Sequence, residues 1–241
     1  PDAITIACRV KVSDVNDATS FDTSNSNFKI QGSLTITIPN GGEKWIIGST
    51  PNITWTKSGS IANVKLEYST DGGSTYAPIV ASTPNYQTYA WTIPDTASTT
   101  CKVKISDVID PTVNDESNAN FKIQPGFTIT SPNGGETWLV GSSQTITWTT
   151  QGTVLFVKLE YSTDGGTTYP YSITSSTGNT GSYPWTVPDN VSGTVRVRVV
   201  HPNDPEAFDA SNGNFRIRVF FNLTRPNGGQ QWVVGNTYNI T

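Results

Sequence analysis

The sequence predicts an all-β protein built from tandem antiparallel β-sandwiches. Three observations support this fold class: apolar residues alternate with polar ones, turn-forming residues separate the alternating runs, and the whole pattern repeats along the chain. Of the 241 residues, 21 are Gly and 15 are Pro, whereas only 14% are charged. This composition is typical of many short strands joined by turns.

The repeat is marked by the motif Pro-Asn-Gly-Gly, which begins at Pro39, Pro132 and Pro226, so the period is 93 and then 94 residues. Fixed periods of this kind indicate a tandem array of one structural unit. We therefore expect two complete β-sandwich repeats flanked by the C-terminal part of one repeat and the N-terminal part of another. In chain order these four segments are residues 1–30, 31–123, 124–217 and 218–241.

The two ends of the sequence fall inside repeats. The chain opens Pro-Asp-Ala, contains no Met, and stops at Thr241, within a predicted strand. We therefore expect the natural polypeptide to be longer and to contain further copies. Whether these copies lie in one continuous chain or are joined by strand exchange between chains stays open, because incomplete repeats leave strand edges that another chain can pair with.

Within a repeat the apolar period is two residues. Val64, Leu66 and Tyr68 alternate with Lys65 and Glu67, which is the pattern of a half-buried strand. Seven or eight short strands and no helical stretch in each repeat predict an immunoglobulin-like or fibronectin-like sandwich. In the first complete repeat the strands are expected near residues 34–38, 44–47, 52–56, 63–69, 75–81, 87–93, 100–106 and 119–123.

Charge and hydropathy set aside two classes of partner. The net charge is −4, which offers no basic surface for nucleic acid or anionic lipid. No apolar run approaches the roughly 18 residues of a membrane-spanning helix, so no transmembrane segment is expected in this piece.

Two eight-residue motifs, running from Ser69 to Tyr76 and from Ser162 to Tyr169, share the pattern Ser-x-Asp-x-Gly-x-Thr-aromatic. The pattern resembles the Asp box of sialidases and related propellers. That resemblance implies a hairpin-turn device in which the carboxylate caps backbone amides and the ring tucks beneath. It does not imply an active site.

A second recurrent cluster holds acidic and amide side chains before the last strand of each copy. Oxygen-rich loops of this kind can bind calcium, although each copy offers only two recurring carboxylates and the spacing matches no EF-hand loop. Asx and Ser turns explain the same residues without a metal, and we favour them. A carboxylate pair also suits glycoside hydrolysis, but its presence in every copy favours an architectural role. The calcium candidates are Asp17, Asp22, Asp110, Asp115, Asp204 and Asp209.

Seven tryptophans recur at three positions of the repeat, mostly inside alternating strands. We expect them to be buried, with Trp55 and Trp148 between the two sheets. Trp45, Trp138 and Trp232 follow the Gly-Gly turn, where a partly exposed ring is the alternative, and Trp45 and Trp138 are the candidates for sugar contact.

The remaining reactive residues predict no catalysis and no cofactor. Cys8 and Cys101 occupy the same position in successive copies, where the third copy has Val195, so we expect buried thiols and no disulfide. The single histidine, His201, is expected in a surface loop without metal-ligand spacing. No Gly-x-Ser-x-Gly elbow occurs, so nucleophilic and metal-assisted catalysis lack their parts.

Glycosylation is a separate prediction. Four Asn-x-Ser/Thr sequons occur, at Asn52, Asn190, Asn222 and Asn239. Exposed threonines on the outer faces of the strands are equally good candidates for O-linked sugar.

Each full repeat carries Pro-Asn-Gly-Gly-Glu-x-Trp, then Ile-Thr-Trp, then Val-Lys-Leu-Glu-Tyr-Ser-Thr-Asp-Gly-Gly, and finally Asp-x-Ser-Asn-x-Asn-Phe. This series resembles the Ser-Thr-rich, surface-anchored immunoglobulin-like domain related to yeast cell-wall glucan-assembly proteins, which is common in secreted bacterial and archaeal surface proteins. The resemblance covers both full repeats and both partial ones.

The resemblance implies an extracellular location and a role as spacer, stalk or adhesive module. We expect a non-enzymatic structural protein of the cell surface that forms a rod, stalk or filament, with neighbouring repeats, copies of itself or cell-surface polysaccharide as partners. The alternative is a carbohydrate-binding accessory region of a larger secreted hydrolase, because fold alone does not determine activity.

Overall fold

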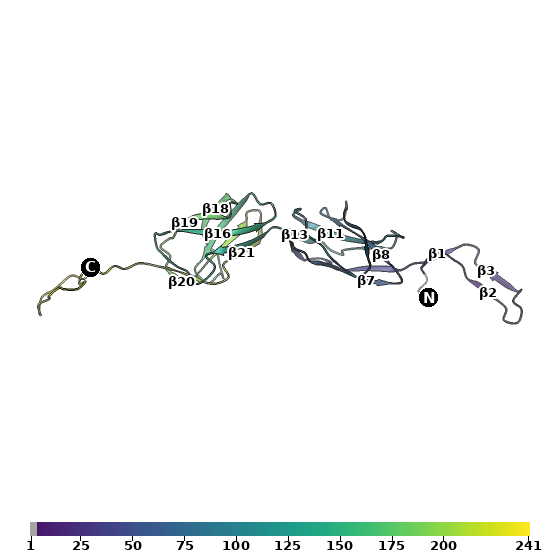
Figure 1. Ribbon diagram of the computed structural model, residues 1–241, viewed down its shortest axis with the longest axis horizontal. Coiled ribbons are helices and arrows are strands. Elements are labelled where there is room, and N and C mark those ends of the chain that lie inside the picture. The colour runs from purple at the N-terminus through teal and green to yellow at the C-terminus, as the bar shows by residue number, and fades with distance from the viewer. Residues whose placement is uncertain (1–3) are drawn as a thin grey trace. The chain divides into compact units, whose positions relative to one another are not determined.

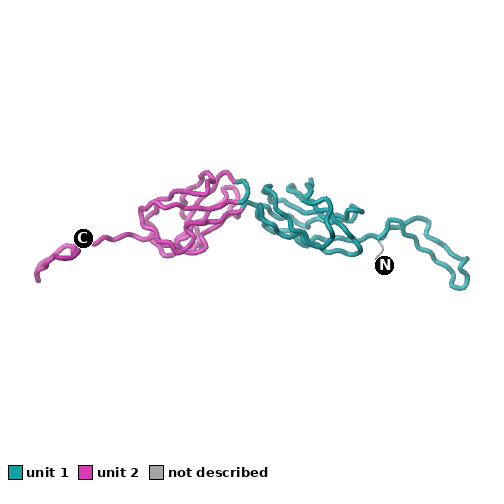
Figure 2. The backbone as a smooth tube through the Cα atoms, viewed as in Figure 1, with its two compact units in different colours: residues 1–125, 151–153 teal, residues 126–150, 154–241 magenta. Residues whose placement is uncertain are grey.

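The computed structural model describes residues 4–241, and the secondary structure in that range consists of strands and turns (Figure 1). Contacts divide the chain into two units (Figure 2). Unit 1 holds residues 1–125 together with Gln151–Thr153, and unit 2 holds Gly126–Thr150 and Val154–Thr241. Residues 1–3 of the first expected segment lie outside the described residues.

The smaller sheet of unit 1 has the strand order β10-β7-β5, with antiparallel pairing throughout. Its strands are β5 (Ser33–Ile38), β7 (Asn52–Ser58) and β10 (Thr88–Ala90). Along β5 the buried Leu34 and Ile36 alternate with the exposed Thr35 and Thr37. This alternation of side chains follows directly from the two-residue period of the sequence.

The larger sheet of unit 1 has the order β6-β13-β11-β8-β9, and β12 also pairs with β11. Most pairs are antiparallel, but β6 and β13 run parallel, which the expectation of antiparallel strands missed. The turn after Pro39 carries the chain from one sheet to the other, so β6 arrives beside the last strand in the same direction. The six strands are β6 (Lys44–Ile46), β8 (Asn63–Ser69), β9 (Ala77–Pro84), β11 (Ser98–Asp107), β12 (Asn114–Glu116) and β13 (Phe121–Gln124).

Unit 2 repeats this topology. Its smaller sheet has the order β14-β16-β19 and its larger sheet β15-β22-β20-β17-β18, with β21 paired to β20. The parallel pair recurs between β15 and β22. The strands are β14 (Gly126–Ser131), β15 (Thr137–Leu139), β16 (Ser143–Gln151), β17 (Phe156–Ser162), β18 (Tyr171–Gly178), β19 (Ser182–Thr186), β20 (Ser192–His201), β21 (Asp204–Ala210) and β22 (Phe215–Arg218).

In each unit the core lies between the two sheets. In unit 1, the Trp45 ring packs edge-on to Trp91, with the ring centroids 5.9 Å apart, and its centroid lies 4.9 Å from that of Phe121. In unit 2, the centroid of Trp138 lies 5.8 Å from that of Trp185 and 4.9 Å from that of Phe215. Two stacked sheets with one apolar layer between them make each complete repeat an immunoglobulin/fibronectin-like sandwich, as the sequence predicts.

The flanking segments form less regular structure. Residues 4–30 contain two antiparallel pairs, β1 (Thr5–Cys8) with β4 (Phe28–Ile30) and β2 (Lys11–Ser13) with β3 (Phe21–Thr23). Residues 219–241 contain no strand, although Trp232 stacks on Tyr238 with the ring centroids 4.8 Å apart.

Two strand predictions differ from the structure. Strand β9 begins at Ala77, because Thr75 and Tyr76 belong to the preceding turn, and it continues to Pro84. Strand β12 was not expected, because Asn114–Glu116 is short and wholly polar. Its pairing with β11 provides the structure that the sequence pattern does not show.

Candidate functional site

The Asp-box turns are built by one carboxylate in each unit. The Oδ1 atom of Asp71 accepts hydrogen bonds from the Ser69 hydroxyl at 2.7 Å and from the Thr75 backbone N–H at 2.9 Å. Its Oδ2 atom accepts a third from the Thr75 hydroxyl at 2.6 Å. Asp164 makes the corresponding contacts in unit 2. The predicted turn device is therefore confirmed at both motifs.

These hydrogen bonds favour the ionised carboxylate. The Thr75 hydroxyl, followed by the Ser69 hydroxyl, lowers the pKa of Asp71 to about 2. The Ser162 and Thr168 hydroxyls likewise hold the pKa of Asp164 well below its usual range. A carboxylate held this firmly in the charged form suits a permanent turn and is a poor proton donor near neutral pH.

The aromatic residue that ends each Asp box contacts the larger sheet. The Tyr76 hydroxyl donates to Glu116 Oε2 at 2.6 Å, and burial together with this carboxylate raises the pKa of Tyr76. In unit 2 the guanidinium of Arg198 lies 4.3 Å from the ring centroid of Tyr169. Arg198 also binds Glu160 through Nε at 2.8 Å and through its NH2 group at 2.7 Å.

The acidic cluster before the last strand connects the two sheets of each sandwich. Asp115, on β12, accepts a hydrogen bond from the backbone N–H of Ile36 on β5, at 2.7 Å from Oδ2. Asp209 does the same for Ile129 at 2.7 Å in unit 2. Ser117 is fully buried, and its hydroxyl donates to Pro39 O at 2.7 Å while accepting from Val103 N–H at 3.0 Å.

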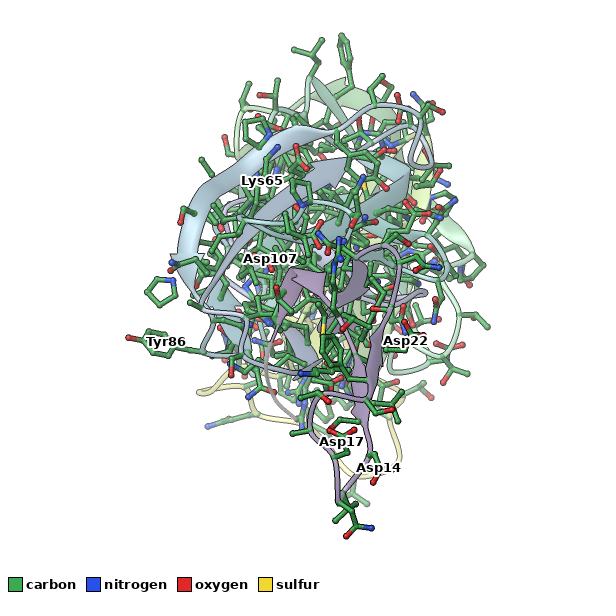
Figure 3. The ribbon with its side chains drawn as sticks, turned by 90° about the vertical axis from the view of Figure 1, so that its right-hand side faces the viewer. Asp14, Asp17, Asp22, Lys65, Tyr86 and Asp107 are labelled. Atoms are coloured by element: carbon green, nitrogen blue, oxygen red, sulfur yellow. The ribbon has the colours of Figure 1, made fainter. Side chains whose placement is uncertain are left out.

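The predicted calcium candidates act singly. Asp110 holds Thr112 through Oδ1, Asp17 holds Thr19, and Asp204 accepts from the Glu206 backbone N–H at 3.3 Å. Asp22 lies on β3, apart from Asp14 and Asp17 near the tip of its hairpin (Figure 3). Within residues 4–241, no group of three or more His, Cys, Asp or Glu side chains gathers as a metal site would require. The geometry matches the Asx-turn alternative at Asp17 and Asp110.

Six of the seven tryptophans are buried, as expected, whereas Trp232 is 41% exposed. Trp45 is 8% exposed and Trp138 is 7% exposed, so neither ring offers an open face for stacking on a sugar. The sugar-contact alternative at these two positions is therefore corrected: the turn places each ring against the core and not on the surface. Trp55 reaches a partner that the sequence did not point to, because its Nε1–H donates to Asn85 Oδ1 at 2.7 Å.

Asn85 and its counterpart Asn179 are site residues that motif analysis missed. Each accepts from a tryptophan indole and donates to a backbone carbonyl, of Ile61 at 3.1 Å and of Val154 at 3.0 Å. Their offset of 94 residues is the signal that could have found them, although their neighbours in the sequence differ.

The Pro-Asn-Gly-Gly motif is also an internal support. Glu43 accepts hydrogen bonds from the backbone N–H groups of Asn40 at 2.8 Å and Gly41 at 2.9 Å. Gly41 has φ +129°, and a Cβ there would lie 2.6 Å from the Cβ of Ala119. Only glycine fits this backbone and this close approach.

The two cysteines and the single histidine belong to three different copies of the repeat. Cys101 is buried and Cys8 is half-buried, and both are free thiols. Burial raises the pKa of the Cys101 thiol, which makes it a small apolar side chain in practice. His201 ends strand β20 and is half-exposed, so the expected surface-loop position is corrected to a strand end.

The four sequons differ in accessibility. Asn52 is exposed on β7, and Asn222 and Asn239 are exposed in the C-terminal segment. Asn190 is half-buried, and its amide nitrogen donates to the Tyr161 hydroxyl at 2.8 Å. A glycan at Asn190 would replace one of the two hydrogens of this nitrogen, beside the half-buried contact with Tyr161.

The smaller sheet presents an outer face rich in hydroxyl groups. Thr37 and Thr54 meet at 2.7 Å between their Oγ1 atoms, and Thr130 and Thr147 meet at 2.6 Å. Strands β14, β16 and β19 contain no charged residue at all. The charged side chains of the larger sheet pair with one another instead, as Lys65 does with Glu67 at 2.6 Å.

A small polar hollow lies on the larger sheet of unit 1. Its lining includes Lys65, Glu67, Lys104 and Asp107, two of which, Lys65 and Asp107, are labelled in Figure 3. Lys65 and Glu67 form an ion pair with each other, so these two charges of the hollow are already paired.

The sequence matches no protein-family model and no curated protein. Within the described residues, no helix is long and apolar enough to cross a membrane. Solved structures with a similar chain path include the fibronectin(III)-like modules of Clostridium thermocellum CbhA, at 18% identity and a TM-score of 0.30, covering 83% of this chain and 100% of that chain.

Two further similar structures are a chimeric titin Z1Z2 and a Dscam isoform. The titin chimera is 14% identical with a TM-score of 0.27, and the match covers 78% of this chain and 98% of that chain. The Dscam structure is 10% identical with a TM-score of 0.30, and the match covers 83% of this chain and 52% of that chain. The immunoglobulin/fibronectin-like fold assignment rests on the strand pairing and buried core described above.

Proposed function

We propose that this chain is a non-enzymatic, extracellular structural repeat region that forms a rod, stalk or surface filament. One observation carries the proposal: the recurring polar residues make the same internal contacts in both complete repeats. Asp71 and Asp164 hold turns, Asp115 and Asp209 connect sheets, and Asn85 and Asn179 hold indoles.

Side chains that recur because they stabilise the fold support a structural role for the repeat. A catalytic or binding site usually gathers polar groups toward one cleft where a ligand can enter. Here each of these polar groups makes its contact inside its own repeat, so recurrence preserves the sandwich. This supports selection for a stable module that can be copied many times.

The short connections support an array in series. Strand β4 ends at Ile30 and β5 begins at Ser33, while β13 ends at Gln124 and β14 begins at Gly126. Connections this short leave little freedom between successive copies, unlike the long flexible linkers that join independently acting domains. The resemblance to surface-anchored Ser-Thr-rich domains adds the extracellular location and an adhesive role to this proposal.

The polysaccharide-binding alternative receives less support. Its best candidates, Trp45 and Trp138, contribute to the core. Substitution Trp45→Ala is therefore expected to destabilise the first complete repeat by about 3–5 kcal/mol. Measurable polysaccharide binding by the wild-type chain, lost in a folded variant with threonines of the hydroxyl face replaced, would instead favour the alternative.

Electron microscopy of the native material at physiological salt tests the leading proposal. Strands of eight to ten residues with end loops predict an axial spacing on the order of 35 to 45 Å per repeat. Long beaded filaments with this spacing would support a structural polymer. Short rods that end in a separate globular head would overturn the filament and make the repeats a spacer for that head.

A further inference from the structure

Within unit 1, one basic side chain connects two copies of the repeat. Lys29 lies at the centre of β4, the last strand of the first, partial copy. Its ammonium group donates to the Thr112 hydroxyl at 2.7 Å and forms an ion pair with Asp110 Oδ2. Both partners belong to the loop before β12 of the following copy, 81 and 83 residues further along the chain.

The Asp110 carboxylate is held in place by hydrogen bonds within its own turn. Asp110 Oδ1 accepts from the Thr112 hydroxyl at 2.7 Å and from the Thr112 backbone N–H at 3.3 Å. This orients the lone pairs of the Thr112 oxygen toward Lys29. The Oδ2 atom of Asp110 is enclosed from solvent, so Lys29 supplies the counter-charge that an enclosed carboxylate oxygen needs. The hydrogen bond from Lys29 also lowers the pKa of Asp110, and its influence is larger than that of the Thr112 hydroxyl.

An apolar contact accompanies the ion pair. Ile4, in the partial copy, packs against the core of the following repeat. Gly59 leaves room for the Ile4 side chain, because a Cβ added at Gly59, where φ is +83°, would lie 3.2 Å from Ile4 Cδ1. The same glycine recurs as Gly152, where an added Cβ would lie 2.7 Å from Ile47 Cδ1, so neither position has room for a side chain.

Unit 1 contains a second contact between a carboxylate and another copy of the repeat, with an amide and a hydroxyl as the donors. Asp95 accepts from the Thr153 backbone N–H at 2.9 Å and from the Thr153 hydroxyl at 2.5 Å. Thr153 lies in the segment Gln151–Thr153, which is part of unit 1. A carboxylate of one copy therefore again meets a hydroxyl and an amide that lie beyond the end of that copy in the sequence.

The two halves of the Lys29 contact recur in the sequence. The basic residue is Lys29 in the first copy, Lys122 in the second and Arg216 in the third, each between Phe and Ile. The carboxylate is Asp17, Asp110 and Asp204 at the same offsets. Asp17 holds Thr19 through Oδ1, at 3.0 Å from the backbone N and 2.5 Å from the hydroxyl, so it is built like Asp110.

We propose that Asp110 and Thr112 form the receptor of a joint between successive repeats, whose ligand is the basic side chain of a Phe-Lys/Arg-Ile strand in a preceding copy. By the same geometry Asp17 and Thr19 are a receptor for the Lys or Arg of a further copy. The inference rests on the proposed structural function, because it assigns the partner that such an array requires.

Hydrogen–deuterium exchange on the full 241-residue protein tests the joint. Lys29→Met removes the charge and keeps most of the stem, and Asp110→Asn removes the carboxylate. Each is expected to speed amide exchange in β4 and in residues 109–113 by about two- to fivefold, as for a partly exposed ion pair. The double variant should exchange no faster than the single ones, because both remove the same contact.

Asp17→Asn is the matched control. It weakens a turn of the same construction, so its effect is expected to stay near residues 17–19. A Lys29→Met protein with unchanged exchange in both segments, or single effects that add fully in the double variant, would overturn the joint. The charge exchange Lys29→Asp with Asp110→Lys should restore slow exchange if the pairing itself matters.

Failure of the joint can be told apart from failure of the proposed function. If electron microscopy shows beaded filaments but hydrogen exchange shows no coupling between Lys29 and Asp110, only the proposed joint is wrong. If hydrogen exchange shows the coupling but electron microscopy shows no axial repeat, the joint stands and the proposed filament is wrong.

Discussion

Asp115 and Ile36 connect the two sheets of the first complete repeat through one hydrogen bond, 2.7 Å from the carboxylate oxygen to the backbone nitrogen. The two residues are 79 positions apart in the sequence. Asp209 and Ile129 repeat the connection in unit 2. A side chain that satisfies a backbone donor across the sandwich fixes how the smaller sheet is placed against the larger one.

Replacing this carboxylate is expected to destabilise the repeat. Asp115→Ala should lower the free energy of unfolding by about 1.5–3 kcal/mol, because the Ile36 N–H loses a charged acceptor. Denaturant unfolding followed by tryptophan fluorescence measures the change. Asp22→Ala, at the same offset on exposed β3, is the control, with an expected change within about 0.5 kcal/mol. Equal effects at Asp115 and Asp22 would contradict the structural role.

The buried indole of Trp55 leads to a second prediction. Asn85→Ala leaves the Trp55 Nε1–H without its acceptor, which is expected to cost about 1–3 kcal/mol of stability. Asn179→Ala should affect unit 2 in the same way through Trp148. Combining Asn85→Ala with Trp55→Phe tests the pairing, since the second change removes the donor. Full additivity of the two changes in a denaturation experiment would argue against the bond.

The Asp-box carboxylate predicts a specific pH dependence. The pKa of Asp71 is lowered to about 2 in the folded protein, so its contribution to stability is present above its ordinary pKa of 3.8. That contribution is lost as pH falls from there through about 2. An NMR titration of the Asp71 side-chain carboxyl carbon should show the low midpoint. Thr75→Val should raise it more than Ser69→Ala, because the Thr75 hydroxyl is the stronger influence.

Thiol labelling separates the two cysteines. In the native protein Cys8 is expected to react with a small disulfide reagent, whereas Cys101, which is fully buried, should react only after unfolding. Cys101→Val should fold normally, with a stability change below about 1.5 kcal/mol, because the third copy carries Val195 at that position. Rapid labelling of both thiols in native buffer would contradict the burial of Cys101.

The fold follows from the sequence because its signals are local and repeated. The alternation around Val64 and Leu66 determines which side chains of β8 face the core, and the Gly-rich turns determine where strands end. The parallel pairing of β6 with β13 does not follow from such signals, because it joins segments nearly 80 residues apart. Periodicity gives the faces of a strand but not its neighbours.

The same distinction between local and distant partners applies to the candidate site residues. The turns at Asp71 and Asp164 were predictable, since all their partners lie within four residues. The acceptor role of Asp115 and the indole contact of Asn85 were not, since their partners are distant in the chain. Recurrence could flag these residues as constrained, but only the folded structure supplies the atom each one contacts.

The parallel pair of β6 and β13 has a mechanical consequence. Each repeat pairs a strand near its start with its last strand, and the two strands run in the same direction. Trp45 lies opposite Ile123 in unit 1, and Trp138 lies opposite Ile217 in unit 2. Tension applied along the chain pulls such strands lengthwise past each other, so their hydrogen bonds are strained together and do not open one after another. Under the proposed structural function, a repeat of this design would resist stretching along the chain.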